Sequence, residues 1–381
     1  MNVLWVNSGT TDTLSNTRLH GIIPVFNEWG DKSHAILGGK SSADLPDYFI
    51  IIPVPLGKQR LYWLLVTLLL PFLCLKYKTD IILTDWMSAR LTYLVILLKK
   101  VGLLKCKLVH DVRTVPVRED SGKAYRAYSG SLKYAQRHFD GLTTITNPLR
   151  DEICAEFGFP ESKIGVWTSG VNVDHFKPQN ASGLRKELGL EGKFVVFYHG
   201  AVNENRGVIE LAGAAEHLRD LPDLRIIIVG RGNRWSELET VIKQKSLEQV
   251  ILKPGVPYAE IPRWVAMADL CAVPLPDHPW WRVSSPLKLM EYLAMEKPVL
   301  LTEMPAHRAV IPDDKDAFYV PSANPEMFAV GIRRAISQKE RFKEMGETGR
   351  HKAKSILTWE MQAKFLHDYF DKVLQAQINL N

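Results

Sequence analysis

Short apolar runs alternate with longer amphipathic stretches along almost the whole chain. Such runs, bounded by Gly, Pro or polar residues, are typical of buried strands, and the stretches between them have helical length and spacing. This alternation predicts an α/β fold with parallel sheets covered by helices. The predicted strands are residues 3–6, 34–37, 48–52, 80–83, 106–110, 142–146, 164–167, 194–200, 224–232, 249–255, 269–274, 297–302 and 317–320.

One segment rich in Pro, Asn, Ser and Gly, residues 176–183, interrupts this alternation, which then restarts. A chain of 381 residues also suits two domains better than one. We therefore predict a first Rossmann-like domain over residues 1–178, a second over 187–358 and a final helical segment over 359–381.

Composition adds little to this picture, with 46% hydrophobic and 24% charged residues as in ordinary folded proteins. The N-terminus lacks a basic segment and a small-residue cleavage site, so we expect a first strand there rather than a signal peptide. The cysteines follow no CxxC or Cys/His spacing and are expected to be reduced thiols of a cytoplasmic protein. No cluster of Asp, Glu and His predicts a metal site.

Charge is distributed unevenly between the two halves. Residues 1–186 contain 23 Lys+Arg against 16 Asp+Glu, whereas the remainder contains 25 against 26. A basic first half favours an anionic surface or substrate. Its basic residues are scattered and accompany no recognition motif, so we do not expect nucleic acid as the partner.

Residues 61–75, LYWLLVTLLLPFLCL, are strongly apolar and flanked by basic residues. As a helix they measure about 22 Å, short of the roughly 30 Å of a membrane's hydrocarbon core. A helix buried in the domain core and a helix lying in a membrane interface both fit this segment, and a span fits less well. A second run, residues 91–100, ends in paired lysines. We expect a peripheral protein on the inner face of the cell membrane, contacting it through residues 61–75.

Residues 284–300, SSPLKLMEYLAMEKPVL, carry the most informative chemistry. Ser285 is a good helix N-cap and Pro286 suits the first helical position. The exposed amides of Leu287 and Lys288 would then form a site for a diphosphate. Glu291 lies about 4.5 Å further along the axis, where its carboxylate is placed to accept hydrogen bonds from ribose hydroxyls. The alternative is an amphipathic helix with a Lys–Glu surface pair.

Three loops that follow predicted strands support a ligand site. Arg206 lies near a helix start, where it is placed to bind a phosphate. Gly230, Arg231 and a second glycine follow the next strand; they lack the third glycine of a dinucleotide fingerprint but allow a ligand near the backbone. A nucleobase has main-chain amides available around Val256. His110 ends a strand before a polar loop, where a structural histidine and a sugar-binding one both fit.

Taken in order, these segments resemble the retaining GT-B glycosyltransferases, which include bacterial mannosyl- and N-acetylglucosaminyltransferases. The resemblance covers residues 110–381 well and the first hundred residues poorly. It is carried by ITNPLRDEICAEFGFPESKIGVWTSGVNVDHF (145–176), the HGA…NRG loop that begins with Gly200 and its neighbours, VGRG, GVPYAEIP, SPLKLMEYLAMEKPV, NPEMFAVGIRRAI (324–336) and TWE (358–360).

The resemblance implies two domains facing across a cleft, with the last helix packing back on the first domain. It implies that Arg206 and Lys288 bind the donor diphosphate, that Glu291 binds the ribose and that His110 lies near the transferred sugar. It further implies a metal-independent transfer with retention, from a UDP-, GDP- or ADP-sugar to a glycan or lipid-linked acceptor.

The chain departs from the family pattern at several positions, of which Val283 bears on the transferred sugar. Val283 stands where the family often has the first of two glutamates, and Ala201 where it often has an arginine. The transferred sugar is therefore left open. The competing interpretations are a nucleotide-sugar epimerase of the same architecture and a non-catalytic peripheral membrane protein with this fold. An NAD-dependent enzyme is disfavoured because no intact GxGxxG follows a strand.

Overall fold

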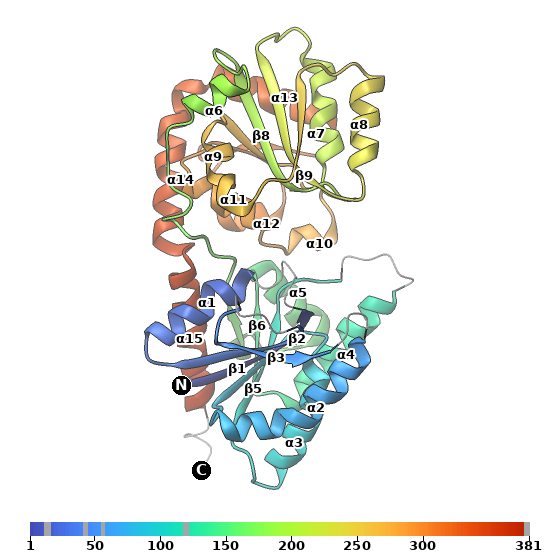
Figure 1. The fold of residues 1–381 in the computed structure, drawn as a ribbon, viewed down its shortest axis with the longest axis vertical. Helices are drawn as coiled ribbons and strands as arrows, with labels where there is room; N and C mark the ends of the chain where they lie inside the picture. The colour runs from blue at the N-terminus through green and yellow to red at the C-terminus, as the bar shows by residue number, and fades with distance from the viewer. Residues whose placement is uncertain (11–16, 41–44, 55–57, 117–121, 377–381) are drawn as a thin grey trace. The chain divides into compact units, whose positions relative to one another are not determined.

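The computed structural model describes residues 1–10, 17–40, 45–54, 58–116 and 122–376, which form two compact units (Figure 1). Unit 1 consists of Met1–Gly170 together with Trp359–Asn381, and unit 2 of Val171–Thr358. Each strand predicted from the sequence is present. The first boundary lies before the predicted residues 176–183, because Val171 and Phe176 are buried in the core of unit 2.

Unit 1 contains a parallel seven-stranded sheet in the order β3-β2-β1-β4-β5-β6-β7. Helices cover both faces of this sheet (Figure 1). The strands are β1 (Asn2–Thr10), β2 (Lys32–Gly39), β3 (Phe49–Pro53), β4 (Ile81–Thr84), β5 (Lys107–Val112), β6 (Gly141–Thr144) and β7 (Ile164–Val166). The helices are α1 (Thr17–Glu28), α2 (Gln59–Lys76), α3 (Tyr93–Lys100), α4 (Lys123–His138), α5 (Asn147–Phe157) and, from the end of the chain, α15 (Trp359–Gln375).

Helix α15 completes unit 1, as the resemblance implies for the last helix. It packs against α1 and β7, and its Leu366 and Phe370 are fully buried in the same core as Phe26 of α1. The Tyr369 hydroxyl donates to the carbonyl of Lys163 (2.7 Å) and accepts from the Leu142 amide (2.9 Å). These contacts fix the last helix on the β6–β7 edge of the sheet.

Unit 2 contains a parallel six-stranded sheet in the order β10-β9-β8-β11-β12-β13, again with helices on both faces (Figure 1). The strands are β8 (Phe194–Ala201), β9 (Leu224–Arg231), β10 (Val250–Pro254), β11 (Leu270–Val273), β12 (Val299–Thr302) and β13 (Phe318–Val320). The helices are α6 (Ser182–Glu187), α7 (Val208–Gly213), α8 (Trp235–Gln244), α9 (Ile261–Ala266), α10 (Pro279–Arg282), α11 (Leu287–Ala294), α12 (Pro305–Val310), α13 (Pro325–Ser337) and α14 (Phe342–Ile356).

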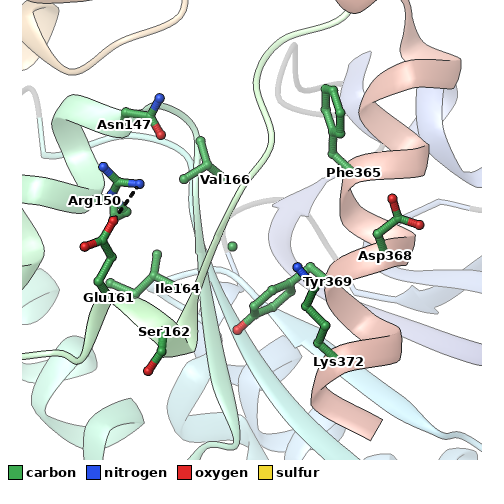
Figure 2. Close-up of a pocket in the computed structure, with 11 residues that line it drawn as sticks. Asn147, Arg150, Glu161, Ser162, Ile164, Val166, Phe365, Asp368, Tyr369 and Lys372 are labelled. Atoms are coloured by element: carbon green, nitrogen blue, oxygen red, sulfur yellow. Dashed lines mark ion pairs between the residues drawn. The ribbon is translucent and has the colours of Figure 1, made fainter. Parts of the chain in front are cut away.

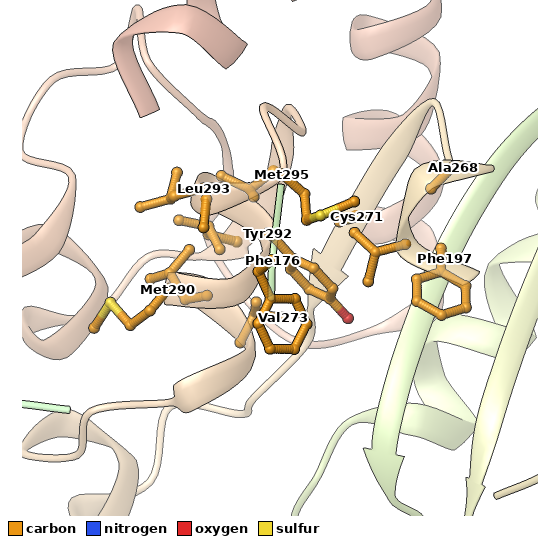
Figure 3. Close-up of a cluster of buried hydrophobic side chains, with 14 of the residues drawn as sticks. Phe176, Phe197, Ala268, Cys271, Val273, Met290, Tyr292, Leu293 and Met295 are labelled. Atoms are coloured by element: carbon orange, nitrogen blue, oxygen red, sulfur yellow. The ribbon is translucent and has the colours of Figure 1, made fainter. Parts of the chain in front are cut away.

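The strand order of unit 2 reverses between β8 and β11. In open parallel sheets, ligands bind beyond the carboxyl ends of the strands at such a reversal. Helix α11 follows β11 in the chain and is anchored in the core by Met290, Tyr292 and Leu293, which pack among Phe176 and the β-strand side chains (Figure 3). The topology therefore directs attention to the ends of β8 and β11 and to the first turn of α11.

Candidate functional site

Helix α11 begins one residue later than the sequence predicts. Pro286, rather than Ser285, occupies the N-cap position, with extended dihedrals (φ −73°, ψ 112°), and Leu287 is the first helical residue. The Pro286 carbonyl accepts from the Leu289 amide at 3.0 Å. The prediction of Ser285 as N-cap is wrong, because the carbonyl of Pro286 already closes the first turn. Amides in a first helical turn have no acceptor within the helix, so those of Leu287 and Lys288 suit an anion.

Lys288 reaches from this first turn across the end of β8. Its Nζ lies 3.4 Å from the Tyr198 hydroxyl and 4.6 Å from the centroid of that ring. Gly200 has φ of +132°, and a Cβ at this position would lie 3.1 Å from Nζ. The absence of a side chain at Gly200 therefore leaves room for the Lys288 side chain.

Arg206 is held beside Lys288 by an aromatic residue of α10. Its guanidinium carbon lies 4.4 Å from the centroid of the Trp281 ring, and the Trp281 indole donates to the Asn205 carbonyl at 2.6 Å. Gly207 follows with φ of +66°, and a Cβ there would lie 1.7 Å from the Pro274 carbonyl oxygen. The loop is thus pinned to the end of β11 directly after Arg206.

Burial is the main cause of the pKa shifts of both cations. Burial, and then the positive charge of Arg206, lower the pKa of Lys288 to about 7, and burial also lowers the pKa of Arg206. Within the described residues, neither cation forms an ion pair with a carboxylate. Two adjacent, desolvated positive charges at a helix start form a site for a multiply charged anion.

Glu291 does not pair with Lys288 on the helix surface, so the amphipathic-helix alternative is wrong. Its side chain is buried, and Oε2 lies 2.8 Å from Nε2 of His199 at the end of β8. The imidazole is held on its other side by Tyr292, whose hydroxyl lies 3.0 Å from His199 Nδ1. The structure therefore adds His199 and Tyr292 to the site around Glu291.

Three polar contacts surround His199. The Tyr292 hydroxyl accepts from the His199 backbone amide (3.2 Å) and lies beside Nδ1 of the ring. Nε2 faces the Glu291 carboxylate, where an N–H at this nitrogen is placed to donate. Among the described residues, Oε2 is the only side-chain oxygen of Glu291 for which a hydrogen bond is seen.

Comparison with known proteins identifies the family. Residues 182–352 match the family described as Glycosyl transferases group 1, and residues 28–175 match Glycosyltransferase Family 4. The chain belongs to these glycosyltransferases.

Curated relatives are distant and matched over part of their length. The spore coat protein SA of Bacillus subtilis is 24% identical over 251 residues, which are 61% of this chain and 64% of that protein. A D-inositol 3-phosphate glycosyltransferase of Segniliparus rotundus is 28% identical over 208 residues, 53% of this chain and 45% of that protein. The chain thus spans about half to two-thirds of the length of these relatives.

Solved structures cover the whole chain and show the GT-B fold. A glycosyltransferase of Rickettsia africae superposes with a TM-score of 0.75 at 18% identity, covering 98% of each chain. Anabaena Alr3699/HepE in complex with UDP superposes with a TM-score of 0.79 at 15% identity, covering 98% of this chain and all of that one.

The remaining predicted loop residues of the glycosyltransferase lie at or just beyond the ends of β9 and β10. A Cβ at Gly230 would lie 1.9 Å from the Gly200 carbonyl oxygen, so the close pairing of β8 with β9 requires a glycine there. Arg231 is exposed, and Val256 packs its side chain against the unit 2 core. Tyr258 stacks on His175, and burial, then Glu291, raise the Tyr258 pKa to about 12.

Val283, at the position of the family's first glutamate, is buried, 4% exposed. The neighbouring Arg282 is exposed and makes a bidentate ion pair with Asp277 (2.6 and 2.8 Å). Arg282 is therefore not directed at the space that the absent glutamate would fill. The glycosyltransferase keeps its cationic and carboxylate groups but has no charged side chain at this point of the sugar site.

His110 lies at the end of β5 in unit 1 and is fully buried. Its Nδ1 lies 3.3 Å from the Thr84 hydroxyl and its Nε2 3.3 Å from the Ser131 hydroxyl, and burial lowers its pKa to about 4. With both ring nitrogens engaged and no exposed surface, the imidazole is not available to a sugar hydroxyl. We therefore correct the prediction that His110 faces the transferred sugar and favour the structural role.

The charged residues that follow His110 also hold the sheet together. Asp111 accepts from the Thr143 hydroxyl (2.8 Å) and the Trp167 indole (3.2 Å). Arg113 stacks on the Trp167 ring at 3.6 Å and donates to the carbonyls of Trp167 and Thr168. Arg113 is thus engaged with the backbone and the ring of the segment that follows β7.

A cavity of about 610 Å³ lies in unit 1, between α5, β7 and α15 (Figure 2). Its charged side chains are partly neutralised among themselves, since Arg150 pairs with Asp151 (2.8 Å) and Glu161 (3.0 Å). The groups of the donor site belong to unit 2 and do not line it. We therefore place the site of the glycosyltransferase at the β8–β11 reversal and not in this cavity.

Proposed function

We propose that this protein is a retaining, metal-independent glycosyltransferase that moves a hexose from a nucleotide-diphosphate sugar to a glycan or lipid-linked acceptor. The observation that carries the proposal is the pair of desolvated cations, Arg206 and Lys288, beside the start of α11, with the buried carboxylate of Glu291 one turn further along. Solved GT-B proteins of similar fold are described in complex with UDP and with UDP-glucose, which supports a nucleotide-sugar donor.

In this proposal the donor diphosphate binds between Arg206, Lys288 and the first amides of α11. Negative charge accumulates on the leaving phosphate as the glycosidic bond breaks, and these groups stabilise it. They supply the charge compensation that a divalent cation provides in other transferases. The departing phosphate then takes the proton of the acceptor hydroxyl, and the new bond forms on the face that the phosphate leaves.

The acceptor and the location are proposed from unit 1. Its basic balance and the apolar surface of α2 support an acceptor that is presented at a membrane, such as a lipid-linked glycan, in the synthesis of surface polysaccharide or glycolipid. We propose that the protein works in the cytoplasm, peripherally bound to the inner face of the cell membrane.

Thermal shift over a panel of UDP-, GDP- and ADP-sugars tests the donor proposal. A ligand that binds only the folded state raises the melting temperature, and one nucleotide series should do so at concentrations well above its Kd. Product analysis with the selected donor alone then separates transfer from epimerisation, because an epimerase would convert the donor without acceptor. Absence of a shift with every nucleotide would support a non-catalytic protein and overturn the proposal.

The contact between His199 and Glu291 predicts a positioning role for the histidine. In His199→Leu, Glu291 loses the donor that orients it, so we expect the Kd for the nucleotide to rise about tenfold, as for loss of a hydrogen bond to a charged group. His199→Gln retains an N–H donor and should restore most of the affinity. Calorimetric titration measures both variants. Equal Kd values for both variants and the wild type would contradict the positioning role.

A further inference from the structure

Helices α2 and α3 of unit 1 pack against each other, and exposed large hydrophobic side chains gather on them and on the turn that follows α3. On α2 these side chains recur every three or four positions and form one stripe along the outer face. Each is between 42% and 62% exposed: Leu61, Leu64, Leu68, Phe72 and Leu75. Exposed apolar surface continues on α3 and the turn after it, at Tyr93, Leu97, Val101 and Leu103. We name these nine residues the apolar face.

The opposite side of α2 belongs to the core of unit 1. Tyr62, Val66 and Leu70 are buried between α2 and the sheet, and the Tyr62 hydroxyl donates to the Asn7 carbonyl at 2.6 Å. Within the described part of the chain, α2 is the one helix long and apolar enough to cross a membrane. Crossing would pull this inner side out of the core, so the structure is incompatible with a span. When a helix is apolar on all sides and only one side is buried, the exposed side is typical of a surface that binds a partner or a membrane.

Positive charge borders the apolar face at both ends. Lys58 and Arg60 precede the stripe, and Lys76 and Lys78 follow it; all four are exposed. Lys100 and Lys105, also exposed, flank the turn after α3.

Residues 58–105 contain only two acidic residues, and both face inward. Asp80 accepts from the Asn2 amide (2.7 Å), and Asp85 accepts from the Ser8 and Ser88 amides (2.9 and 2.8 Å). The exposed charges that residues 58–105 themselves contribute are therefore cationic. This arrangement complements a surface that is apolar inside and anionic at its rim.

We infer that the apolar face is a docking surface for an anionic lipid bilayer, with α2 and α3 lying in the plane of the interface and the turn at Val101 and Leu103 entering the acyl region. The basic residues at both ends then contact the headgroups. The inference rests on the membrane location proposed above and specifies the surface that makes the contact, and it does not depend on the donor proposed for unit 2.

Flotation or sedimentation with vesicles tests this docking surface. The 381-residue chain should bind vesicles of equal parts phosphatidylcholine and phosphatidylglycerol, and bind vesicles of phosphatidylcholine alone much more weakly. Leu68→Glu should lower the partition coefficient about tenfold or more. Lys76→Gln and Lys100→Gln should each lower it about fivefold, and only on the anionic vesicles.

The matched control is Val330→Glu, which makes the same kind of change at a residue of α13 that is 56% exposed. It should leave vesicle binding unchanged, and the thermal shift with the nucleotide should be the same in Leu68→Glu as in the wild type. Unchanged binding in Leu68→Glu would overturn the inference. So would a dimer in solution that Leu68→Glu dissociates while the wild type ignores both vesicles, because the occupant would then be a second copy of the chain.

Discussion

Lys288→Met is expected to lower kcat/KM for the donor by about 10²–10³-fold, the loss typical of removing one preorganised group that stabilises developing negative charge. The lysine is positioned by Gly200 and Tyr198 before any ligand arrives, so little of this stabilisation is spent on reorganisation. Steady-state kinetics with the donor selected by thermal shift measures the effect. Lys243→Met, on the exposed side of α8, removes a charge elsewhere in unit 2 and should have no effect. A ratio within twofold of wild type for Lys288→Met would exclude the proposed role.

The same lysine predicts how nucleotide binding depends on pH. Its pKa in the free protein is lowered to about 7, mainly by burial and then by Arg206, and a bound diphosphate will raise it. Below pH 7 Lys288 is charged in both states and binding takes up no proton at this group. Above pH 7 it is neutral when free and charged when bound, so binding takes up a proton. Above pH 7 the Kd should therefore rise with pH, towards a limit of about tenfold per pH unit.

Calorimetry at pH 8 in buffers of different ionisation enthalpy measures this proton uptake directly. At that pH a terminal phosphate is already ionised, since its second pKa is about 6. Wild type should take up close to one proton per nucleotide bound, and Lys288→Met should take up none. Equal uptake by the two proteins would assign the proton to another group.

Gly207→Ala is expected to give the largest loss of stability in unit 2. The added Cβ would lie 1.7 Å from the Pro274 carbonyl oxygen, at a φ of +66° that L residues rarely adopt. Backbone strain and overpacking together should cost about 3–5 kcal/mol of unfolding free energy. For a unit of this size that corresponds to a fall of about 10 °C in Tm. Thermal unfolding followed by circular dichroism measures the change.

Two other glycines separate the causes of this loss. Gly189 has a similar φ of +65° but no atom within 4 Å of an added Cβ, so Gly189→Ala isolates the backbone strain. Gly183 lies in α6 with open space and no positive φ, so Gly183→Ala should be neutral or slightly stabilising. If Gly207→Ala and Gly189→Ala had the same Tm, the contact with Pro274 would contribute nothing to the loss of stability.

The strands and the cationic groups of the site were predictable from the sequence for physical reasons. Buried parallel strands are continuous apolar runs, and their pattern is visible without tertiary context. The resemblance placed Arg206 and Lys288 in one site. The topology agrees with this, because both residues follow strands of the same sheet and the strand ends converge where the strand order reverses. The predicted start of α11 differed by one residue from the observed start. Ser and Pro are both favoured at a helix start, and only the hydrogen bond that closes the first turn decides which of them is the N-cap.

Other features depend on contacts between segments that are distant in sequence. His199 and Trp281 gain their roles only from Glu291 and Asn205, which lie 92 and 76 residues away. A local indication in the sequence exists only for His199, which directly precedes Gly200 at the end of a predicted strand. His110 was misjudged for the same reason, because the hydroxyls that enclose it come from β4 and α4. For α2, composition cannot tell which of two apolar sides is buried until the sheet is in place.

The placement of α15 bears on how the chain is made. Unit 2 is continuous, whereas unit 1 is assembled from residues at the two ends of the chain. During synthesis from the N-terminus, the second unit emerges complete while the first still lacks the helix that covers its Phe26 side. Unit 1 must therefore remain open at that side until α15 has been synthesised. A nascent chain would expose this apolar groove for the whole time that residues 171–358 are translated, which makes it a natural point of contact for chaperones.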